Sequence, residues 1–342
     1  MDKVRIASIG TSTICSIFCE SIQNVDEIEY VGCFSRDINR AHEFGEARGA
    51  RLFFDNLDDL AASNEIDAVY ISSPNAYHTE QALAMIRGNK HVLIEKPMAL
   101  NYSDAQLIFN EAKKHGVVAL EAMRTIHDPN FVTLGNIVCG MDDIHEASFV
   151  FSKLSSKWAK LQQGVVTSAF SPKAGGGALR DMGIYTVEPA MYLFGYPDKF
   201  TAMGNMYEVE GEGILDLSGK AILSYDTNTV CLSWGKDHDS HLCSEVSSEK
   251  SCVVVDHIEE PSHIDYIVPV KQTGGYSTGE GVSSLVELVK GQKSLEAECC
   301  DFARYILGSK DTNITYEKAQ STTLDSIKLV EEMCKQMGVT TY

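Results

Sequence analysis

The first 122 residues alternate between short apolar runs and segments with helical spacing, and this rhythm constrains the possible folds more than any other feature. Runs rich in β-branched residues, such as Val4–Ile9 and Ile28–Phe34, predict strands. The apolar spacing over Thr13–Ile22 and Ile38–Arg48 predicts helices that follow these strands. Strands that alternate with helices indicate a parallel sheet with right-handed crossovers. We therefore expect an α/β domain with a doubly wound parallel sheet of the Rossmann type over residues 1–122.

The same alternation continues to the end of this domain. Further strands are expected at Arg51–Phe54, Asp67–Ser72, His91–Glu95 and Val117–Glu121, and further helices at Leu57–Ala62, His78–Gly88 and Asp104–His115. Because glycine adopts left-handed backbone angles without strain, we expect Gly88 to cap its helix in that conformation.

After residue 122 the pattern changes to short alternating segments separated by turn residues, which predicts a mostly antiparallel sheet. The expected strands are His145–Lys153, Phe200–Tyr207, Gly219–Tyr225, Thr229–Trp234, Leu242–Ser247 and Ser251–His257. Helices are expected around Ala178–Phe194, Leu295–Leu307 and Tyr316–Met337. Residues 123–342 are therefore expected to form an α+β domain with a large open sheet, which binds substrate and carries the oligomer contacts.

The charge balance argues against nucleic-acid and membrane partners. The chain has 29 Lys and Arg against 48 Asp and Glu, a net charge of -19 that repels phosphates and anionic lipids. It contains no apolar run near the roughly 20 residues needed to span a bilayer, and its start lacks a signal-peptide pattern. We expect a cytoplasmic protein with reduced cysteines. The cluster Asp237-His238-Asp239-Ser240-His241 is interpreted as a solvated loop, so no metal is assigned.

The turn after the first strand is a candidate pyrophosphate site, because helix N-terminal amides and the helix dipole favour an anion there. The fingerprint G-x-G-x-x-G is incomplete in this chain. Only its first glycine is kept in Gly10-Thr11-Ser12-Thr13-Ile14-Cys15, where Ser12 and Cys15 are small replacements. An ordinary strand-to-helix turn remains the alternative interpretation.

The end of the second predicted strand bears on the choice between NADP and NAD. A carboxylate there would accept hydrogen bonds from the adenosine ribose and repel a 2′-phosphate. This chain has Ser35-Arg36, and a guanidinium binds phosphate bidentately, so NADP is favoured over NAD. The alternative is that Arg36 is a solvated residue at a helix start, with Asp37 beside it.

Three later motifs occur in a characteristic order. They are Ser73-Pro74-Asn75 with His78, then Glu95-Lys96-Pro97, then Gly175-Gly176-Gly177-Ala178-Leu179-Arg180-Asp181-Met182-Gly183-Ile184-Tyr185. In this order and spacing the chain resembles the glucose-fructose oxidoreductase, inositol dehydrogenase and MocA family, nearly from end to end.

The resemblance implies roles for these residues. Lys96 matches the lysine of the family's E-K-P motif, which reaches substrate and nicotinamide ribose, and the following proline is often cis. Asp181 and Tyr185 match a catalytic aspartate and a tyrosine on one helix face. Many relatives have histidine instead of this tyrosine. The tyrosine form is similar to branches that favour sugars or vicinal diols and commonly use NADP.

Further cofactor contacts are expected around the same motifs. The expected residues are Ser73, Pro74, Asn75, His78, Glu95, Lys96 and Arg124. For His78, contact with the cofactor and capping of its helix are both open. Arg124 departs from an aromatic residue of some relatives, so their substrates do not transfer directly to this chain.

The chemistry of an alcohol dehydrogenase fits these side chains. A tyrosine with a pKa near 10 cannot take a proton from an alcohol unaided at neutral pH, whereas a neighbouring ammonium makes this possible. We therefore expect Tyr185 to be the acid/base, Lys96 to stabilise the developing alkoxide, and Asp181 to orient substrate or lysine, in a cleft between the domains.

The expected reaction is hydride transfer between NADP(H), or NAD(H), and a secondary alcohol or carbonyl of a sugar, polyol or diol. Two alternatives remain open: a nucleotide-sensing regulator on the same fold, and a redox-assisted glycoside-cleaving enzyme that retains NAD. The exposed face of the large sheet is expected to form a homodimer or homotetramer.

Overall fold

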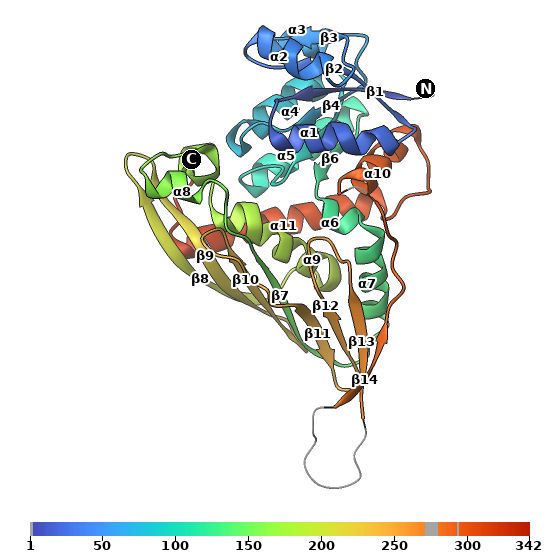
Figure 1. Cartoon of the computed structure of the whole chain (residues 1–342), viewed down its shortest axis with the longest axis vertical. Helices are drawn as coiled ribbons and strands as arrows, with labels where there is room; N and C mark the ends of the chain where they lie inside the picture. Colours follow the sequence, from blue (N-terminus) through green and yellow to red (C-terminus); the bar gives the residue numbers. More distant parts are fainter. Residues whose placement is uncertain (1–2, 271–279, 293) are drawn as a thin grey trace. The chain divides into compact units, whose positions relative to one another are not determined.

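The computed structural model describes residues 3–270, 280–292 and 294–342 (Figure 1). The chain divides into two compact units. The first unit comprises Met1–His127, Lys173–Gly175 and Gln292–Glu331, and the second comprises Asp128–Pro172, Gly176–Gly291 and Glu332–Tyr342. The expected boundary after residue 122 therefore leaves out two later segments that fold with the first unit.

Within the described ranges, the first unit contains a six-stranded parallel sheet with the order β3-β2-β1-β4-β5-β6. Its strands are β1 (Val4–Ile9), β2 (Ile28–Phe34), β3 (Leu52–Phe54), β4 (Ala68–Ile71), β5 (His91–Glu95) and β6 (Ala119–Ala122). The order reverses between β1 and β4, which is the switch point where doubly wound sheets bind ligands. The predicted Rossmann sheet is confirmed.

Helices follow the strands as the apolar spacing predicts. They are α1 (Thr13–Ser21), α2 (Ile38–Glu46), α3 (Leu57–Ala62), α4 (His78–Arg87), α5 (Tyr102–His115), α6 (Arg124–His127), α10 (Glu296–Leu307) and most of α11 (Tyr316–Met337). The central strands are buried along their length, and residues such as Val69 and Val92 form one core with helix residues that include Ile327 of α11. This explains why a segment so late in the sequence belongs to the first unit.

The expected left-handed cap at Gly88 is wrong. Gly88 ends α4 with φ -79°, and the left-handed residue is Asn89 at φ 59°. Glycine is needed at position 88 for space, because a Cβ there would lie 2.5 Å from the carbonyl oxygen of Ala61. The close approach of two helices, which the sequence does not reveal, therefore explains this glycine.

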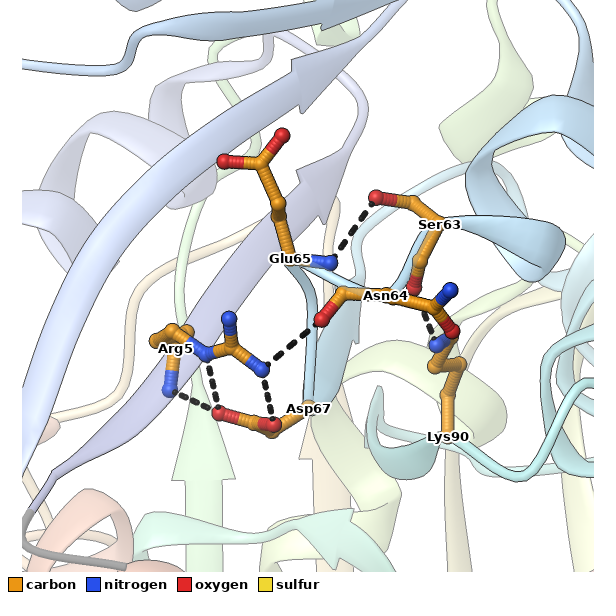
Figure 2. A network of polar contacts seen from close by, with 6 residues as sticks. All are labelled: Arg5, Ser63, Asn64, Glu65, Asp67 and Lys90. Atoms are coloured by element: carbon orange, nitrogen blue, oxygen red, sulfur yellow. Dashed lines mark hydrogen bonds and ion pairs between the residues drawn. The ribbon is translucent and has the colours of Figure 1, made fainter.

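A network of polar contacts lies where strands β1 and β4 begin (Figure 2). The Arg5 guanidinium donates to both oxygens of Asp67, at 2.8 and 2.7 Å, and to the carbonyl oxygen of Asn64 at 3.0 Å. Lys90 donates to the Ser63 carbonyl in the same loop. These contacts join the beginnings of β1 and β4, so we assign them to stability, not to ligand binding.

In the described part of the second unit, eight strands form one open sheet with the order β14-β13-β12-β11-β7-β10-β9-β8. The strands are β7 (Ile144–Ser152), β8 (Lys199–Val209), β9 (Gly213–Ser224), β10 (Thr229–Gly235), β11 (Ser244–Ser248), β12 (Cys252–Val255), β13 (Ile264–Pro269) and β14 (Gly281–Leu285). The sheet is mostly antiparallel as predicted, but β7 and β10 pair in parallel. Strands β13 and β14 were not predicted.

The helices of the second unit differ from expectation, since α7 and α8 were not predicted and α9 begins in another way. They are α7 (Pro129–Cys139), α8 (Trp158–Gln162) and α9 (Ile184–Phe194), with a short 3-10 turn at Ser168–Phe170; a second such turn, Pro172–Ala174, lies where the chain passes into the first unit. The single helix expected over residues 178–194 begins as a π-helical turn, Leu179–Gly183, which continues into α9. Such turns are rare and occur often at functional sites. Within the described ranges, no helix is long and apolar enough to cross a membrane.

Candidate active site

The loop after β1 has the geometry of a phosphate-binding turn. Gly10 adopts φ +113°, and a Cβ there would lie 2.8 Å from the Ser72 hydroxyl oxygen, so only glycine fits without strain. Its amide donates to the Phe34 carbonyl at 3.2 Å, which ties the loop to the end of β2. The first glycine of the fingerprint therefore keeps its structural role.

Helix α1 begins directly after this turn. Ser12 caps it by accepting a hydrogen bond from the Cys15 amide at 3.4 Å. Thr13 and Ile14 are the first helical residues, and amides in a first turn have no intrahelical acceptor, so they are suited to an anion. Cys15, which replaces the third glycine, is fully buried and packs into the core. These features fit the pyrophosphate of a dinucleotide.

The end of β2 carries the residues that the sequence suggests for the choice between NADP and NAD. Asp37 is the N-cap of α2 and accepts from the Asn39 amide at 3.0 Å, so its carboxylate serves the helix. The Ser35 hydroxyl accepts from the Asp37 amide at 3.3 Å. Arg36 is exposed between them. A serine hydroxyl beside an exposed guanidinium suits a 2′-phosphate better than a free ribose hydroxyl.

His78 connects the two motif loops of the first unit. Its buried ring lies with Nδ1 3.0 Å from the Pro97 carbonyl oxygen and Nε2 2.8 Å from the Ser73 carbonyl oxygen. Burial lowers its pKa. Both ring nitrogens therefore face backbone carbonyls that lie outside α4. The structure therefore uses His78 to hold the Ser73-Pro74-Asn75 loop against the Lys96-Pro97 turn, whose peptide bond is cis.

The Ser73-Pro74-Asn75 loop is held on its other side as well. Asn75 donates through Nδ2 to the Gly175 carbonyl at 3.0 Å, and Ser73 donates to Gln81 at 2.7 Å. Gly175 has φ +76°, and a Cβ there would lie 2.6 Å from Leu100. The first unit thus brings together the first two motifs and the first glycine of the third.

Buried carboxyl groups lie behind the Glu95-Lys96-Pro97 motif. Glu95 ends β5 and accepts a hydrogen bond from the Tyr70 hydroxyl, and burial raises the pKa of Glu95. Glu121 on β6 accepts from the Met98 amide at 2.7 Å, and burial raises its pKa to about 7. Burial, reinforced by the charge of Glu95, also raises the pKa of Glu298 on α10. Burial therefore favours the neutral form of all three carboxyl groups, Glu95, Glu121 and Glu298.

Arg124 begins α6, and its guanidinium donates to the Ser294 hydroxyl. Its positive charge acts on Glu95 and Glu298, where it opposes the rise of their pKa values. Glu95 and Arg124, both expected to contact the cofactor, thus have partners within the first unit. Whether either also contacts the cofactor stays a prediction.

The second unit holds Asp181 and Tyr185. Asp181 lies in the π-helical turn and Tyr185 in the first turn of α9, and both are partly exposed. The Tyr185 ring packs edge-on against Phe151, with centroids 5.2 Å apart. Phe151 also lines a cavity of about 400 Å³ whose lining includes His241 and His257. Phe151 is thus shared between the contact with the Tyr185 ring and the lining of this cavity, which contains both polar and apolar side chains.

The buried side chains of Asp216 and Trp234 hold the π-helical turn that precedes α9. Asp216 accepts from the Leu179 amide at 2.7 Å and from the Trp234 indole at 2.8 Å. Burial raises the pKa of Asp216. A Cβ at Gly177, where φ is +127°, would lie 2.8 Å from an Asp216 oxygen, which accounts for the last glycine of the triple-glycine motif.

Lys236, which was not singled out from the sequence, lies 2.8 Å from Asp181 and is fully buried. One feature of the sequence could have identified it. Lys236 directly follows an apolar strand and precedes the cluster 237–241, and a lysine directly after an apolar strand is a candidate for a buried cation. Asp216, Glu121 and Glu298 were also missed. Lys96 belongs to the first unit, and Asp181, Tyr185 and Lys236 belong to the second.

Comparisons with known proteins agree with the motifs and the fold. Residues 4–122 match the model of the oxidoreductase family with an NAD-binding Rossmann fold, GFO_IDH_MocA. The chain is 33% identical over 340 residues to scyllo-inositol 2-dehydrogenase (NADP(+)) of Bacillus subtilis (strain 168), with 98% of each chain covered. It is 30% identical over 250 residues to trans-1,2-dihydrobenzene-1,2-diol dehydrogenase of Oryctolagus cuniculus, covering 71% of this chain and 69% of that protein.

Solved structures extend the likeness to the whole fold. A 3-ketoreductase from Actinomadura kijaniata in complex with NADP and TDP-benzene gives a TM-score of 0.82 at 20% identity, with 98% of each chain covered. At this identity the likeness bears on the fold alone. It extends over both units.

Proposed function

Because the chain belongs to the GFO_IDH_MocA family of oxidoreductases with an NAD-binding Rossmann fold, it is an NAD(P)-dependent dehydrogenase of CH-OH groups, and we propose that it prefers NADP(H) and acts on an inositol or a similar polyol. The observation that carries the substrate class is the 33% identity to an NADP-dependent scyllo-inositol dehydrogenase over 98% of the chain. The Asp37 carboxylate caps α2, so Ser35 and Arg36 are the neighbouring side chains that would meet the adenosine ribose. This arrangement supports the preference for NADP.

The residues of the first unit would hold the dinucleotide. Gly10, Thr11 and Ser12 with the first-turn amides of Thr13 and Ile14 would bind the pyrophosphate. Ser35 and Arg36 would bind the 2′-phosphate. The contacts of Ser73, Pro74, Asn75, His78, Glu95, Lys96 and Arg124 with the cofactor remain part of this proposal. When bound, the nicotinamide supplies the hydride acceptor or donor.

Proton chemistry falls to the side chains of this protein. Tyr185 would take the proton of the substrate hydroxyl while Lys96 donates a hydrogen bond to the same oxygen, so that negative charge on it is stabilised as it develops. Asp181 would orient substrate or lysine. Polar residues of the cavity that Phe151 lines, such as His241 and His257, would receive further hydroxyl groups of a polyol.

A screen of inositols, sugars and vicinal diols with NADP⁺ and NAD⁺, followed by the absorbance of the reduced nicotinamide, tests the proposal. We expect turnover with at least one inositol and a higher kcat/KM with NADP⁺. Nicotinamide binding without turnover of any compound would favour the regulator, and co-purified NAD that never exchanges would favour the glycoside-cleaving enzyme. Either result would overturn the proposed reaction.

We also propose a cytosolic homodimer or homotetramer that forms through the outer face of the large sheet. Met203 on β8 and Ile222 on β9 are 67% and 53% exposed, which leaves apolar side chains on adjacent strands in water. Light scattering after gel filtration tests this assembly. We expect Ile222→Glu to shift the wild-type oligomer toward the monomer, and a monomeric wild-type protein would contradict the proposal.

A further inference from the structure

The backbone of Lys236 is held in place by hydrogen bonds on both sides. It directly follows β10 and its side chain is fully buried. Its amide donates to the Leu217 carbonyl at 2.8 Å, and its carbonyl accepts from the Ser155 amide at 2.9 Å. The backbone of this residue is thus hydrogen-bonded on both sides, so the place from which the side chain departs is fixed.

The ammonium of Lys236 has three kinds of partner, all in the second unit. Its Nζ lies 2.8 Å from Asp181 Oδ2 and 2.8 Å from the Ala169 carbonyl oxygen, and 4.6 Å from the centroid of the Phe170 ring. A lysine ammonium has three donors and no acceptor, so this arrangement matches its chemistry. Removing an ammonium from water is costly unless such partners compensate the loss of hydration.

The two ends of the pair differ in exposure. The Lys236 side chain is fully buried, whereas 36% of the Asp181 side chain is exposed. The cation is therefore the fixed member, and the carboxylate is the member that solvent or a ligand reaches. Ala169 further connects the pair to the triple-glycine motif, because its carbonyl also accepts from the Gly177 amide at 3.3 Å.

We propose that Lys236 is a positioning residue that holds the Asp181 carboxylate ionised and in one orientation toward the substrate. The inference rests on the proposed function for the role of Asp181. A carboxylate on a mobile side chain samples several rotamers, and an ammonium that cannot move selects one of them. The π-helical turn that carries Asp181 would make this anchor more important, because its backbone geometry departs from that of an ordinary helix.

The first test is Lys236→Met, which keeps the length of the side chain and removes the charge. Asp181 retains access to water, so we expect the variant to fold. With scyllo-inositol and NADP⁺, kcat should fall by about 100-fold while the Kd for NADPH stays unchanged, because misplacing a reacting group by about 1 Å has effects of this size. Lys90→Met is the matched control, since Lys90 is a buried lysine whose partner is the Ser63 carbonyl, and its kcat should remain near wild type.

Two readouts separate positioning from a merely structural role. In the Asp181→Asn background, Lys236→Met should lower kcat little further, because the lysine acts through the aspartate. Lys236→Ala should regain activity when propylammonium is added but not when tetramethylammonium, which has no N–H donor, is added. Multiplied losses in the double variant, or no selective rescue, would overturn the inference.

An activity-free measurement distinguishes this inference from the proposed function. Carbodiimide attacks protonated carboxyl groups, so labelling of the Asp181 peptide, followed by mass spectrometry, should be slow in the wild type and several-fold faster in Lys236→Met. If the wild type turns over none of the polyols, the proposed function fails, and the labelling still decides whether Lys236 controls Asp181. Equal labelling in both proteins would refute that control.

Discussion

Glu121→Gln should change how the stability of the protein depends on pH. Burial raises the pKa of Glu121 from 4.5 to about 7, and the carboxyl accepts a hydrogen bond from Met98 that a glutamine oxygen can also accept. In the wild type, the folded state binds the proton more tightly than the unfolded state between these two values. The contribution of this group is therefore full below pH 4.5 and is lost as the pH rises through about 7.

The magnitude follows from the displacement of the pKa. At about 1.36 kcal/mol for each pH unit, a rise from 4.5 to about 7 corresponds to roughly 3 kcal/mol. The free energy of unfolding of Glu121→Gln minus that of the wild type should therefore increase by about this amount between acidic and mildly alkaline pH, because only the wild type loses stability as the pH rises. Urea unfolding followed by far-UV circular dichroism across this range measures it.

A surface variant provides the control for this experiment. Glu43→Gln, on the exposed side of α2, removes one carboxyl without changing a buried site. Its difference from wild type should stay small across the range. If the difference in unfolding free energy between Glu121→Gln and wild type were equally independent of pH, burial would not raise the pKa of Glu121. That result would refute the inference that burial favours the neutral form of this carboxyl group.

Three other substitutions test separate parts of the structure. Arg36→Asp should reverse the preference for NADPH over NADH, and a fluorescence titration in which the native protein binds NADH more tightly would contradict the assignment of Arg36. Hydrogen bonds from Arg5 outweigh burial and lower the pKa of Asp67, so its contribution is present above the unfolded pKa and lost as the pH falls. Asp67→Asn should therefore cost about 2 kcal/mol in urea unfolding at neutral pH, and clearly less in acid. Asp216→Asn should lower kcat with little change in NADPH binding. An unchanged kcat would show that the hydrogen bond from the Leu179 amide to Asp216 has no catalytic consequence.

The sequence predicts the first unit well for a physical reason. Its central strands are buried on both faces, so they form mostly apolar runs such as Val4–Ile9, in which only Arg5 is partly exposed, and these runs stand out from the helices. The second unit is harder, because β13 and β14 are partly polar and exposed strands. The parallel pairing of β7 with β10 depends on the route of the chain, which alternation along a strand does not encode.

The candidate site divides in the same way. Lys96 and Tyr185 were singled out because they lie in motifs with recognisable neighbours. Lys236 lies in no such motif, and its role depends on Asp181, which is distant in sequence. The π-helical turn at Leu179–Gly183 was not predicted because its residues are compatible with an ordinary α-helix. Contacts between distant segments determine these features, and composition and spacing do not report them.

The central proposal is that Lys96 and Tyr185 both act on the substrate hydroxyl. The most direct measurement is kcat/KM for Lys96→Met, Tyr185→Phe and the double variant with scyllo-inositol and NADP⁺, alongside Kd for NADPH. Each single change should lower kcat/KM by roughly two orders of magnitude, and the double variant should be hardly worse than the singles, because residues that act as one unit are strongly non-additive. Unchanged turnover in either single variant, or losses that multiply in the double variant, would contradict it.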